Sequence, residues 1–244
     1  VLQGLRPETV INTAAFHRVD ECEDDPGSSF RVNTIAVRDL ARLASELGFI
    51  LVHFSTDYVF DGRKRAPYIE SDAPNPLNVY AVSKLAGEFF VRSLAEKHFL
   101  IRTCGLFGEA SCREKGYNFV DRMIALAEEG KPLRVVDDQW VSPTSTAELA
   151  ERISDLIRTD QYGLYHLTSE GQCTWFRFAQ ELFSQLGKTP RLEPVDSKSF
   201  AAKARRPLYS VLENKRAKQI GLRDFSPWNN ALRAYLGKKG LIPR

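Results

Sequence analysis

The chain has 244 residues, of which 43% are hydrophobic and 27% are charged. This length fits one large domain, or one domain with a smaller lobe. The formal net charge of +3 is too small to indicate a nucleic-acid partner. No apolar run approaches the roughly 18 residues that a membrane span needs. We therefore expect neither nucleic acid nor a membrane among the partners of this protein.

The cysteines are too widely spaced to indicate a disulfide framework or a metal site. Cys22, Cys104, Cys112 and Cys173 form no CxxC pair, and no histidine lies at ligand spacing to any of them. Reduced thiols in a cytoplasmic protein are the simpler interpretation. Asp24 and Asp25 are interpreted as a solvated turn, and the acidic run at residues 21–25 that contains them as an exposed loop rather than a cation site, so no metal is expected.

The first part of the chain alternates short apolar runs with helical patterns. Helical spacing of apolar residues precedes Gly48, which is a plausible end for a helix. The pattern predicts strands at 9–12, 49–54 and 99–101 and helices at 29–47 and 79–97. Because these strands are almost continuously apolar, they indicate an α/β fold with a parallel, doubly wound, Rossmann-like sheet that is covered on both faces.

The second part of the chain is more broken and is interrupted by prolines. It is predicted to contain strands at 132–136 and 163–167 and helices at 117–129, 145–158, 174–186 and 226–236. We divide the chain into a doubly wound part, 1–105, and a mainly separate smaller C-terminal lobe, 106–244. The chain is expected to cross back to the first part at least once.

Residues that could carry out acid–base chemistry lie at the end of the second strand and on the helix that follows it. Ser55, Thr56 and Asp57 end that strand, and Tyr80 and Lys84 come later, four residues apart on one helix face. A lysine ammonium beside a phenol lowers the tyrosine pKa from about 10 toward neutrality. Such a tyrosine can donate a proton to a carbonyl oxygen while hydride arrives at the carbon. Taken alone, the YxxxK spacing is weak, because a tyrosine at the core edge with a solvated lysine gives the same pattern.

Longer motifs surround this pair and carry a resemblance. Residues 54–62 read FSTDYVFDG, and residues 204–207 read ARRP. Together with further motifs, these runs extend over nearly the whole chain. The further motifs lie at residues 12–15, 19–20, 76–80, 83–88, 138–140, 142–144, 163–167 and 174–175. In these motifs the sequence resembles the extended short-chain dehydrogenase/reductase superfamily and, within it, the dTDP-4-dehydrorhamnose reductase family.

The resemblance implies an oxidoreductase that reduces the C4 ketone of a dTDP-linked 6-deoxy-hexulose, yielding dTDP-rhamnose, with NADPH or NADH as cofactor. The doubly wound part would bind the cofactor and the smaller lobe the nucleotide-sugar; a homodimer is possible. Tyr80 would be the proton donor, Lys84 would bind the nicotinamide ribose, and Thr56 would position the carbonyl. The remaining implied cofactor contacts are Asn12, Ala14, Ala15 and Ser55, and the remaining substrate contacts are Asp57, Phe60, Asn118, Phe119, Trp175 and Arg206.

Two departures from the family pattern affect these expectations. The family begins with a strand and a GxxGxxG turn that holds the cofactor pyrophosphate at a helix start, and no such run occurs in these residues. We therefore expect a chain without that first half, with weak cofactor binding and self-association along the strand at 9–12. In addition, residues 104–106 read Cys-Gly-Leu where relatives often carry Ser-Trp and an apolar residue, which affects the shape of the sugar pocket.

Two other functions stay open at this point. The chain is also similar to a non-catalytic regulatory subunit, the beta subunit of methionine adenosyltransferase, which keeps the Tyr/Lys pair. A sugar-nucleotide epimerase or dehydratase is the third possibility, and the STDYVF run at residues 55–60 argues against it. Turnover of a dTDP-keto-sugar, or co-purification with a catalytic partner, would separate the first two.

Overall fold

A sheet of parallel strands forms the centre of the protein in the computed structural model, which describes residues 2–110 and 116–243. Its strand order is β1-β2-β3-β8, and every pairing is parallel. The strands are β1 (Thr9–Asn12), β2 (Ile50–Thr56), β3 (His98–Thr103) and β8 (Gly163–His166). β2 and β3 are buried along most of their length. The predicted fold class, an α/β protein with a parallel Rossmann-like sheet, is confirmed.

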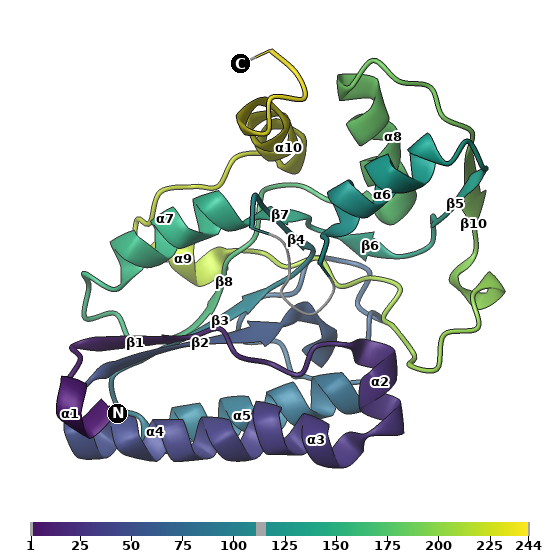
Figure 1. The fold of residues 1–244 in the computed structure, drawn as a ribbon. Helices are drawn as coiled ribbons and strands as arrows, with labels where there is room; N and C mark the ends of the chain where they lie inside the picture. Colours follow the sequence, from purple (N-terminus) through teal and green to yellow (C-terminus); the bar gives the residue numbers. More distant parts are fainter. Residues whose placement is uncertain (1, 111–115, 244) are drawn as a thin grey trace.

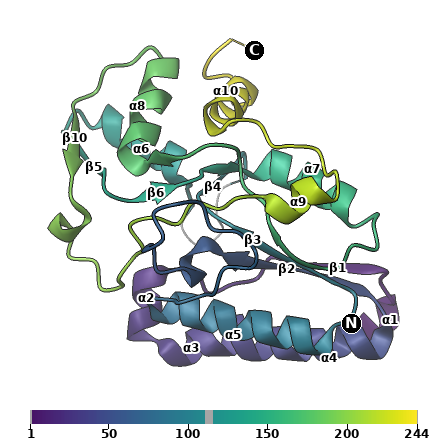
Figure 2. The same ribbon diagram turned by 180° about the vertical axis from the view of Figure 1, so that it is seen from behind.

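Helices cover both faces of this sheet (Figures 1 and 2). One face packs against α3 (Pro26–Phe30), a π-helical turn (Arg31–Ile35), α4 (Ala36–Leu47) and α5 (Val79–Leu94). The other face packs against α7 (Thr146–Leu156) and α9 (Lys215–Gln219). Near-continuous apolar sequences are the expected consequence for β2 and β3, which are buried between these helix layers, whereas the edge strand β1 exposes Ile11.

The position of α5 depends on close contact with the π-helical turn. A side chain at Gly87 would place its Cβ only 2.3 Å from the carbonyl oxygen of Asn33, so only glycine permits this approach. The Asn33 amide donates to the Ser83 hydroxyl at 3.0 Å, and the Thr34 hydroxyl donates to the Ser83 carbonyl at 2.7 Å. These buried hydrogen bonds fix α5, and with it Tyr80, against the helix layer.

The second part of the chain builds a smaller lobe beside the sheet. Its helices α6 (Phe119–Glu128), α8 (Trp175–Gln185) and α10 (Trp228–Lys238) share one apolar core. Its strands form three short pairs, which are β5 (Leu133–Val136) with β10 (Leu192–Val195), β4 (Leu106–Phe107) with β7 (Thr144–Ser145), and β6 (Trp140–Val141) with β9 (Cys173–Thr174). Since α7, β8 and α9 also come from residues after 105, the chain passes more than once between this lobe and the main sheet (Figure 1).

The remaining elements are short, and one corrects an expectation. They are α1 (Leu2–Leu5), α2 (Val19–Asp24) and single 3-10 turns at Asp57–Val59 and Ser197–Ser199. The acidic run interpreted as an exposed loop lies largely in α2, because Asp20 and Glu21 occupy its first turn, where the helix dipole favours negative charge. Within the described ranges, no helix is long and apolar enough to cross a membrane.

The described cysteines Cys22, Cys104 and Cys173 are free and buried, and Cys112 lies outside the described residues.

Candidate active site

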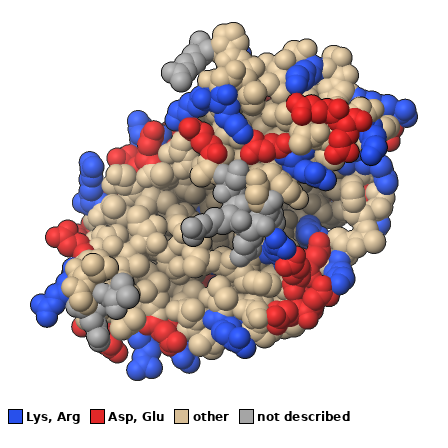
Figure 3. All heavy atoms as spheres, viewed as in Figure 1, with Lys and Arg blue, Asp and Glu red and all other residues tan. Residues whose placement is uncertain are grey.

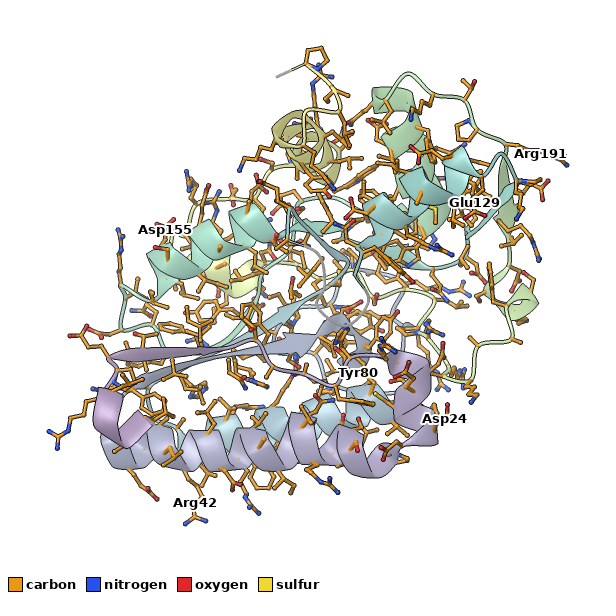
Figure 4. All side chains as sticks on the ribbon, viewed as in Figure 1. Asp24, Arg42, Tyr80, Glu129, Asp155 and Arg191 are labelled. Atoms are coloured by element: carbon orange, nitrogen blue, oxygen red, sulfur yellow. The ribbon has the colours of Figure 1, made fainter. Side chains whose placement is uncertain are left out.

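Tyr80 lies at the start of α5, close to the carboxyl ends of the central strands (Figure 4). Lys84 follows it by one helical turn on the same helix. Asn78 caps this helix, and its side-chain oxygen accepts a hydrogen bond from the backbone N–H of Ala81 at 2.8 Å. Tyr80 is half-buried, and only 2% of Lys84 is exposed. The edge formed by the carboxyl ends of parallel strands is where ligands bind in open α/β sheets.

Thr56 connects the end of β2 to the tyrosine. Its hydroxyl accepts from the backbone N–H of Tyr58 at 3.2 Å and donates to the Asp57 carboxylate at 3.1 Å. The Tyr80 phenol lies close enough to Thr56 for this hydroxyl to act on the pKa of the tyrosine. The structure therefore places Thr56 near Tyr80, and Lys84 follows Tyr80 by one helical turn on α5 and faces His53.

The electrostatics of the tyrosine differ from the expectation. Burial raises the pKa of Tyr80 well above its usual value of 10; the hydrogen bond from Thr56 acts against this shift, and the Asp57 carboxylate adds to it. Lys84 is not among the groups that lower the pKa of Tyr80. The expectation that Lys84 brings this pKa toward neutrality is therefore wrong for this arrangement, in which the lysine amine faces His53.

Lys84 is surrounded by residues that the sequence analysis did not include in the site. Its Nζ lies 3.5 Å from Nε2 of His53, whose other ring nitrogen lies 3.0 Å from the amide nitrogen of Asn12. Glu88, one helical turn further along α5, forms a fully buried ion pair with Arg102 of β3, with N–O distances of 2.9 and 2.6 Å. Burial lowers the pKa of Lys84 to about 8, against the influence of Glu88, which raises it.

Two of these neighbours could have been found from the sequence. His53 precedes Ser55 by two residues in a strand, so both side chains point to the same face of the sheet. Glu88 follows Lys84 by four residues and therefore shares its helix face. His53 is fully buried. Arg102, in contrast, carried no sequence signal.

Asp57 is buried with an incomplete set of hydrogen bonds. Burial raises its pKa to about 7, although hydrogen bonds from Ser210 and Thr56 lower it. Among the described residues, its Oδ2 atom has no hydrogen-bond partner. Asp57 is therefore a carboxyl group that titrates near neutral pH, one residue from Thr56.

The residues expected to border a cofactor lie together at the ends of β1 and β2. Asn12 ends β1, Ala14 is exposed and Ala15 is half-buried. The hydroxyl of Ser55 is buried and finds no hydrogen-bond partner in the part of the chain that the structure describes. Small side chains and an unused buried hydroxyl at this edge fit a polar ligand that lies flat against the strand ends.

A cavity of about 1000 Å³ lies where the smaller lobe meets the loops that follow β2. It combines basic, acidic and aromatic side chains. The lining includes Arg63, Arg65, Lys198, Arg205, Arg206, Asp61, Asp138, Trp140, Phe200 and Tyr209. The Asp61 carboxylate accepts hydrogen bonds from Tyr68 and Asn75. Arg65 and Arg205 form no ion pair with any described residue. The unpaired cations give this cavity a preference for an anion.

Arg206 lies at the boundary between the cavity and the chemical centre. Its guanidinium pairs with the Asp20 carboxylate of α2 at 3.0 Å and is hydrogen-bonded to Tyr58, whose ring lies 6.3 Å from that of Tyr80. Burial alone would raise the pKa of Asp20, but the hydrogen bond and charge of Arg206 hold this pKa below its usual range. Nearby, Lys203 pairs with Asp24 at 2.6 Å. Acidic side chains gather over α2 at the lower right of Figure 3, below a hollow in the surface.

The other expected substrate contacts are distributed unevenly. Phe60 is completely buried and stacks on Tyr68 at 4.1 Å, so the structure does not bring it to a ligand surface. Asn118 caps α6 and donates to the carbonyl of Gly108 and to the hydroxyl of Tyr235. Its amide is thus used within the lobe, and a direct substrate contact by Asn118 is not supported.

Trp175 and Phe119 line the region left small by Gly105. Their rings lie 4.8 Å apart. A Cβ placed on Gly105 would lie 3.5 Å from the indole of Trp175 and 3.0 Å from the Cα of Pro143, and the φ of Gly105 is +57°. The indole of Trp175 therefore lies beside the position where relatives often carry an aromatic side chain.

Fold and site together define a Rossmann-like α/β protein with the Tyr/Lys pair of a short-chain dehydrogenase/reductase. Residues 1–240 match the family described as "RmlD substrate binding domain". The chain belongs to this family, which confirms the predicted family and the prediction of a reductase of this type.

Named relatives agree with this assignment. A dTDP-4-keto-6-deoxy-D-glucose reductase of Streptomyces niveus is 39% identical over 234 residues, covering 95% of this chain and 80% of that protein. A dTDP-4-dehydrorhamnose reductase of Streptomyces griseus is 40% identical, with 93% and 75% covered. The crystal structure of dTDP-4-dehydrorhamnose reductase from Bacillus anthracis in complex with NADP has a TM-score of 0.93 at 37% identity, covering 97% of this chain and 83% of that chain.

Proposed function

We propose that this protein reduces the C4 ketone of a dTDP-linked 6-deoxy-hexulose, with NADPH or NADH as the cofactor. The observation that carries the proposal is the proximity of Thr56 to Tyr80 at the end of β2, with the buried Lys84 one helical turn from Tyr80 on α5. It lies in a chain whose relatives are named as dTDP-keto-sugar reductases. Because those names cover two different keto-sugars, the preferred sugar is left to experiment.

The proton-donating step follows from the state of Tyr80. Because burial keeps the pKa of Tyr80 high, the phenol is protonated at neutral pH, which is the form that a proton donor needs. The phenol donates its proton to the ketone oxygen, and the Thr56 hydroxyl holds that oxygen in place. Lys84 would hold the nicotinamide ribose. Asn12, Ala14, Ala15 and Ser55 would border the nicotinamide cofactor, which would supply the hydride when bound.

The cavity beside this centre supports the choice of a nucleotide-sugar as substrate. Unpaired arginines suit a diphosphate, and the aromatic rings of Trp140, Phe200 and Tyr209 suit a base or a sugar. Arg206 extends from this cavity toward Tyr58 and thus toward the chemical centre. We assign the diphosphate to the Arg205–Arg206 side and the keto-sugar to the region of Tyr80, Thr56 and Trp175. The division at residue 105, a cytoplasmic location and a homodimer also belong to this proposal.

The test is oxidation of NADPH and NADH, followed by absorbance, in the presence of dTDP-4-dehydrorhamnose or dTDP-4-keto-6-deoxyglucose. Product identity is checked by mass spectrometry, and cofactor affinity is measured separately by calorimetry. Turnover of either keto-sugar at the C4 carbonyl supports the proposal. Cofactor binding without turnover of either sugar contradicts it and favours a regulatory protein, which co-purification with a catalytic partner would then identify.

A further inference from the structure

A row of three polar side chains, two of them buried, runs from β1 to α5. The amide nitrogen of Asn12 lies 3.0 Å from Nδ1 of His53, and Nε2 of His53 lies 3.5 Å from Nζ of Lys84. His53 is completely buried, Lys84 is 2% exposed, and Asn12 is half-buried. Because His53 and Lys84 are buried, the positions of their protons depend on the neighbouring side chains.

The backbone determines which way the Asn12 amide faces. The N–H of Ala14 donates to Oδ1 of Asn12 at 3.1 Å, and a backbone N–H can only donate. The amide oxygen is therefore committed to Ala14, and the amide nitrogen is the group that faces His53. Since that nitrogen is a donor, Nδ1 of His53 must accept.

The ring of His53 is consequently left with one arrangement of its proton. Burial, with the charge of Lys84 acting in the same direction, lowers the pKa of His53 well below its usual value, so the ring is neutral. A neutral imidazole carries a single N–H, and with Nδ1 accepting, that proton lies on Nε2. His53 thus presents an N–H, not a lone pair, to Lys84.

An ammonium group has only hydrogens to offer, whereas a neutral amine has a lone pair. If Lys84 is an ammonium, its hydrogens face the N–H of His53, and two donors cannot form a hydrogen bond with each other. If Lys84 is a neutral amine, its lone pair accepts a hydrogen bond from that N–H. We propose that His53 is a positioning residue whose Nε2–H, held in place by Asn12, favours the neutral amine of Lys84.

The other charged groups around Lys84 come from two elements. Glu88 on the same helix favours the ammonium, but its carboxylate is shared with Arg102 of β3 through both oxygens. Tyr80, also on α5, is protonated. Burial adds to the effect of His53, and the pKa of Lys84 is lowered to about 8. Both forms of Lys84 are thus accessible near neutral pH.

The first measurement is the proton position on His53. In protein labelled with 15N-histidine, the ring-nitrogen shifts distinguish the two tautomers, and His53→Phe identifies the signals among the four histidines. We expect a bare Nδ1 and a protonated Nε2. A protonated Nδ1 in the unaltered protein would overturn the proposal, whatever the outcome of the turnover assay.

The second measurement is the titration of Lys84 by NMR of 13C-labelled lysine, assigned with Lys84→Arg. In Asn12→Asp, a carboxylate replaces the amide and accepts from Nδ1–H, so Nε2 is left with a lone pair that stabilises the ammonium. We expect the pKa of Lys84 to rise from about 8 toward the ordinary 10.5. Thr13→Asp is the control, because it adds the same charge at the next, exposed position. Equal shifts in both variants would mean that only charge matters, which contradicts a role for His53.

Discussion

The chemical centre and the neighbouring cavity are built in opposite ways. Around Tyr80 and Lys84, side chains project from β2, β3 and α5, are largely buried, and are held by hydrogen bonds within the core. Around the cavity, Arg63, Arg65 and Arg205 project from loops and are exposed. One region is held in place by the main sheet, and the other is formed largely by exposed loop side chains.

This difference separates the two demands on a reductase. Proton transfer requires atoms fixed within hydrogen-bond distance, which regular elements provide at the cost of burying polar groups. Recognition of a charged ligand tolerates flexible cations at the surface. Substitutions in the centre should therefore change turnover or stability strongly, and substitutions in the cavity should change affinity moderately.

The largest effect is expected at the proton donor. Tyr80→Phe removes the phenolic hydroxyl and should lower kcat by about 10²–10⁴-fold, because that is what a general acid contributes. The fold should be unchanged, since the ring still packs against Tyr58. The measurement is steady-state oxidation of NADPH with the dTDP-keto-sugar.

Tyr58→Phe is the matched control for that variant. It removes a hydroxyl from the neighbouring ring, on the side that is hydrogen-bonded to Arg206. A kcat in Tyr80→Phe that is no lower than in Tyr58→Phe would remove Tyr80 from the mechanism.

The buried ion pair beneath Lys84 should give the next largest effect. Glu88→Gln leaves the Arg102 guanidinium buried without a counter-charge, and both partners are only 1% exposed. Breaking such a pair costs about 3–5 kcal/mol in the free energy of unfolding. Urea unfolding measures this cost. Asp39→Asn removes a carboxylate from an exposed pair with Arg38 and should cost less than about 1 kcal/mol; similar losses in the two variants would contradict the importance of burial.

Asp57 should make stability depend on pH in an unusual direction. Its pKa is about 7 in the folded chain and 3.8 without the fold. The folded chain therefore binds more protons between these values, and this residue's contribution to stability falls as pH rises from about 4 to 7. Asp57→Asn removes the titration, so its stability relative to the unaltered protein should grow across that range by up to about 4 kcal/mol. Urea unfolding at several pH values tests this, and a constant difference would show that Asp57 does not titrate there.

The centre could be predicted from sequence because its chemistry follows the periods of strands and helices. Tyr80 and Lys84 are one helical turn apart, and Thr56 ends an apolar strand. Most elements of the main sheet were found for the same reason. The predicted helix at 79–97 ends at Leu94 instead, because helix ends are weakly specified by sequence.

The cavity could not be predicted in this way. Arg63 and Arg65 line the same cavity as residues between 197 and 209, which lie far from them in the sequence. Asn118 and Phe60 carried family motifs, but capping and burial use their side chains within the protein. The helix α2 was missed since its residues are acidic and its partners, Lys203 and Arg206, lie far along the chain. Loop-to-loop contacts leave no period in the sequence.

The smallest effect is expected where the two regions meet, at Arg206. This guanidinium is 23% exposed, lines the cavity and pairs with Asp20. If it also contacts the diphosphate, Arg206→Ala should raise the KM for the sugar nucleotide about tenfold, because a hydrogen bond to a charged group is worth about 1.5–3 kcal/mol. The KM for the cofactor should not change. Arg38→Ala, which removes an exposed arginine from α4, should leave both constants unaltered. Asp20→Asn separates the two roles of Arg206, because it keeps the guanidinium but releases it from α2. A normal KM for the sugar nucleotide in Arg206→Ala would assign this arginine to the Asp20 ion pair alone and place the diphosphate elsewhere in the cavity.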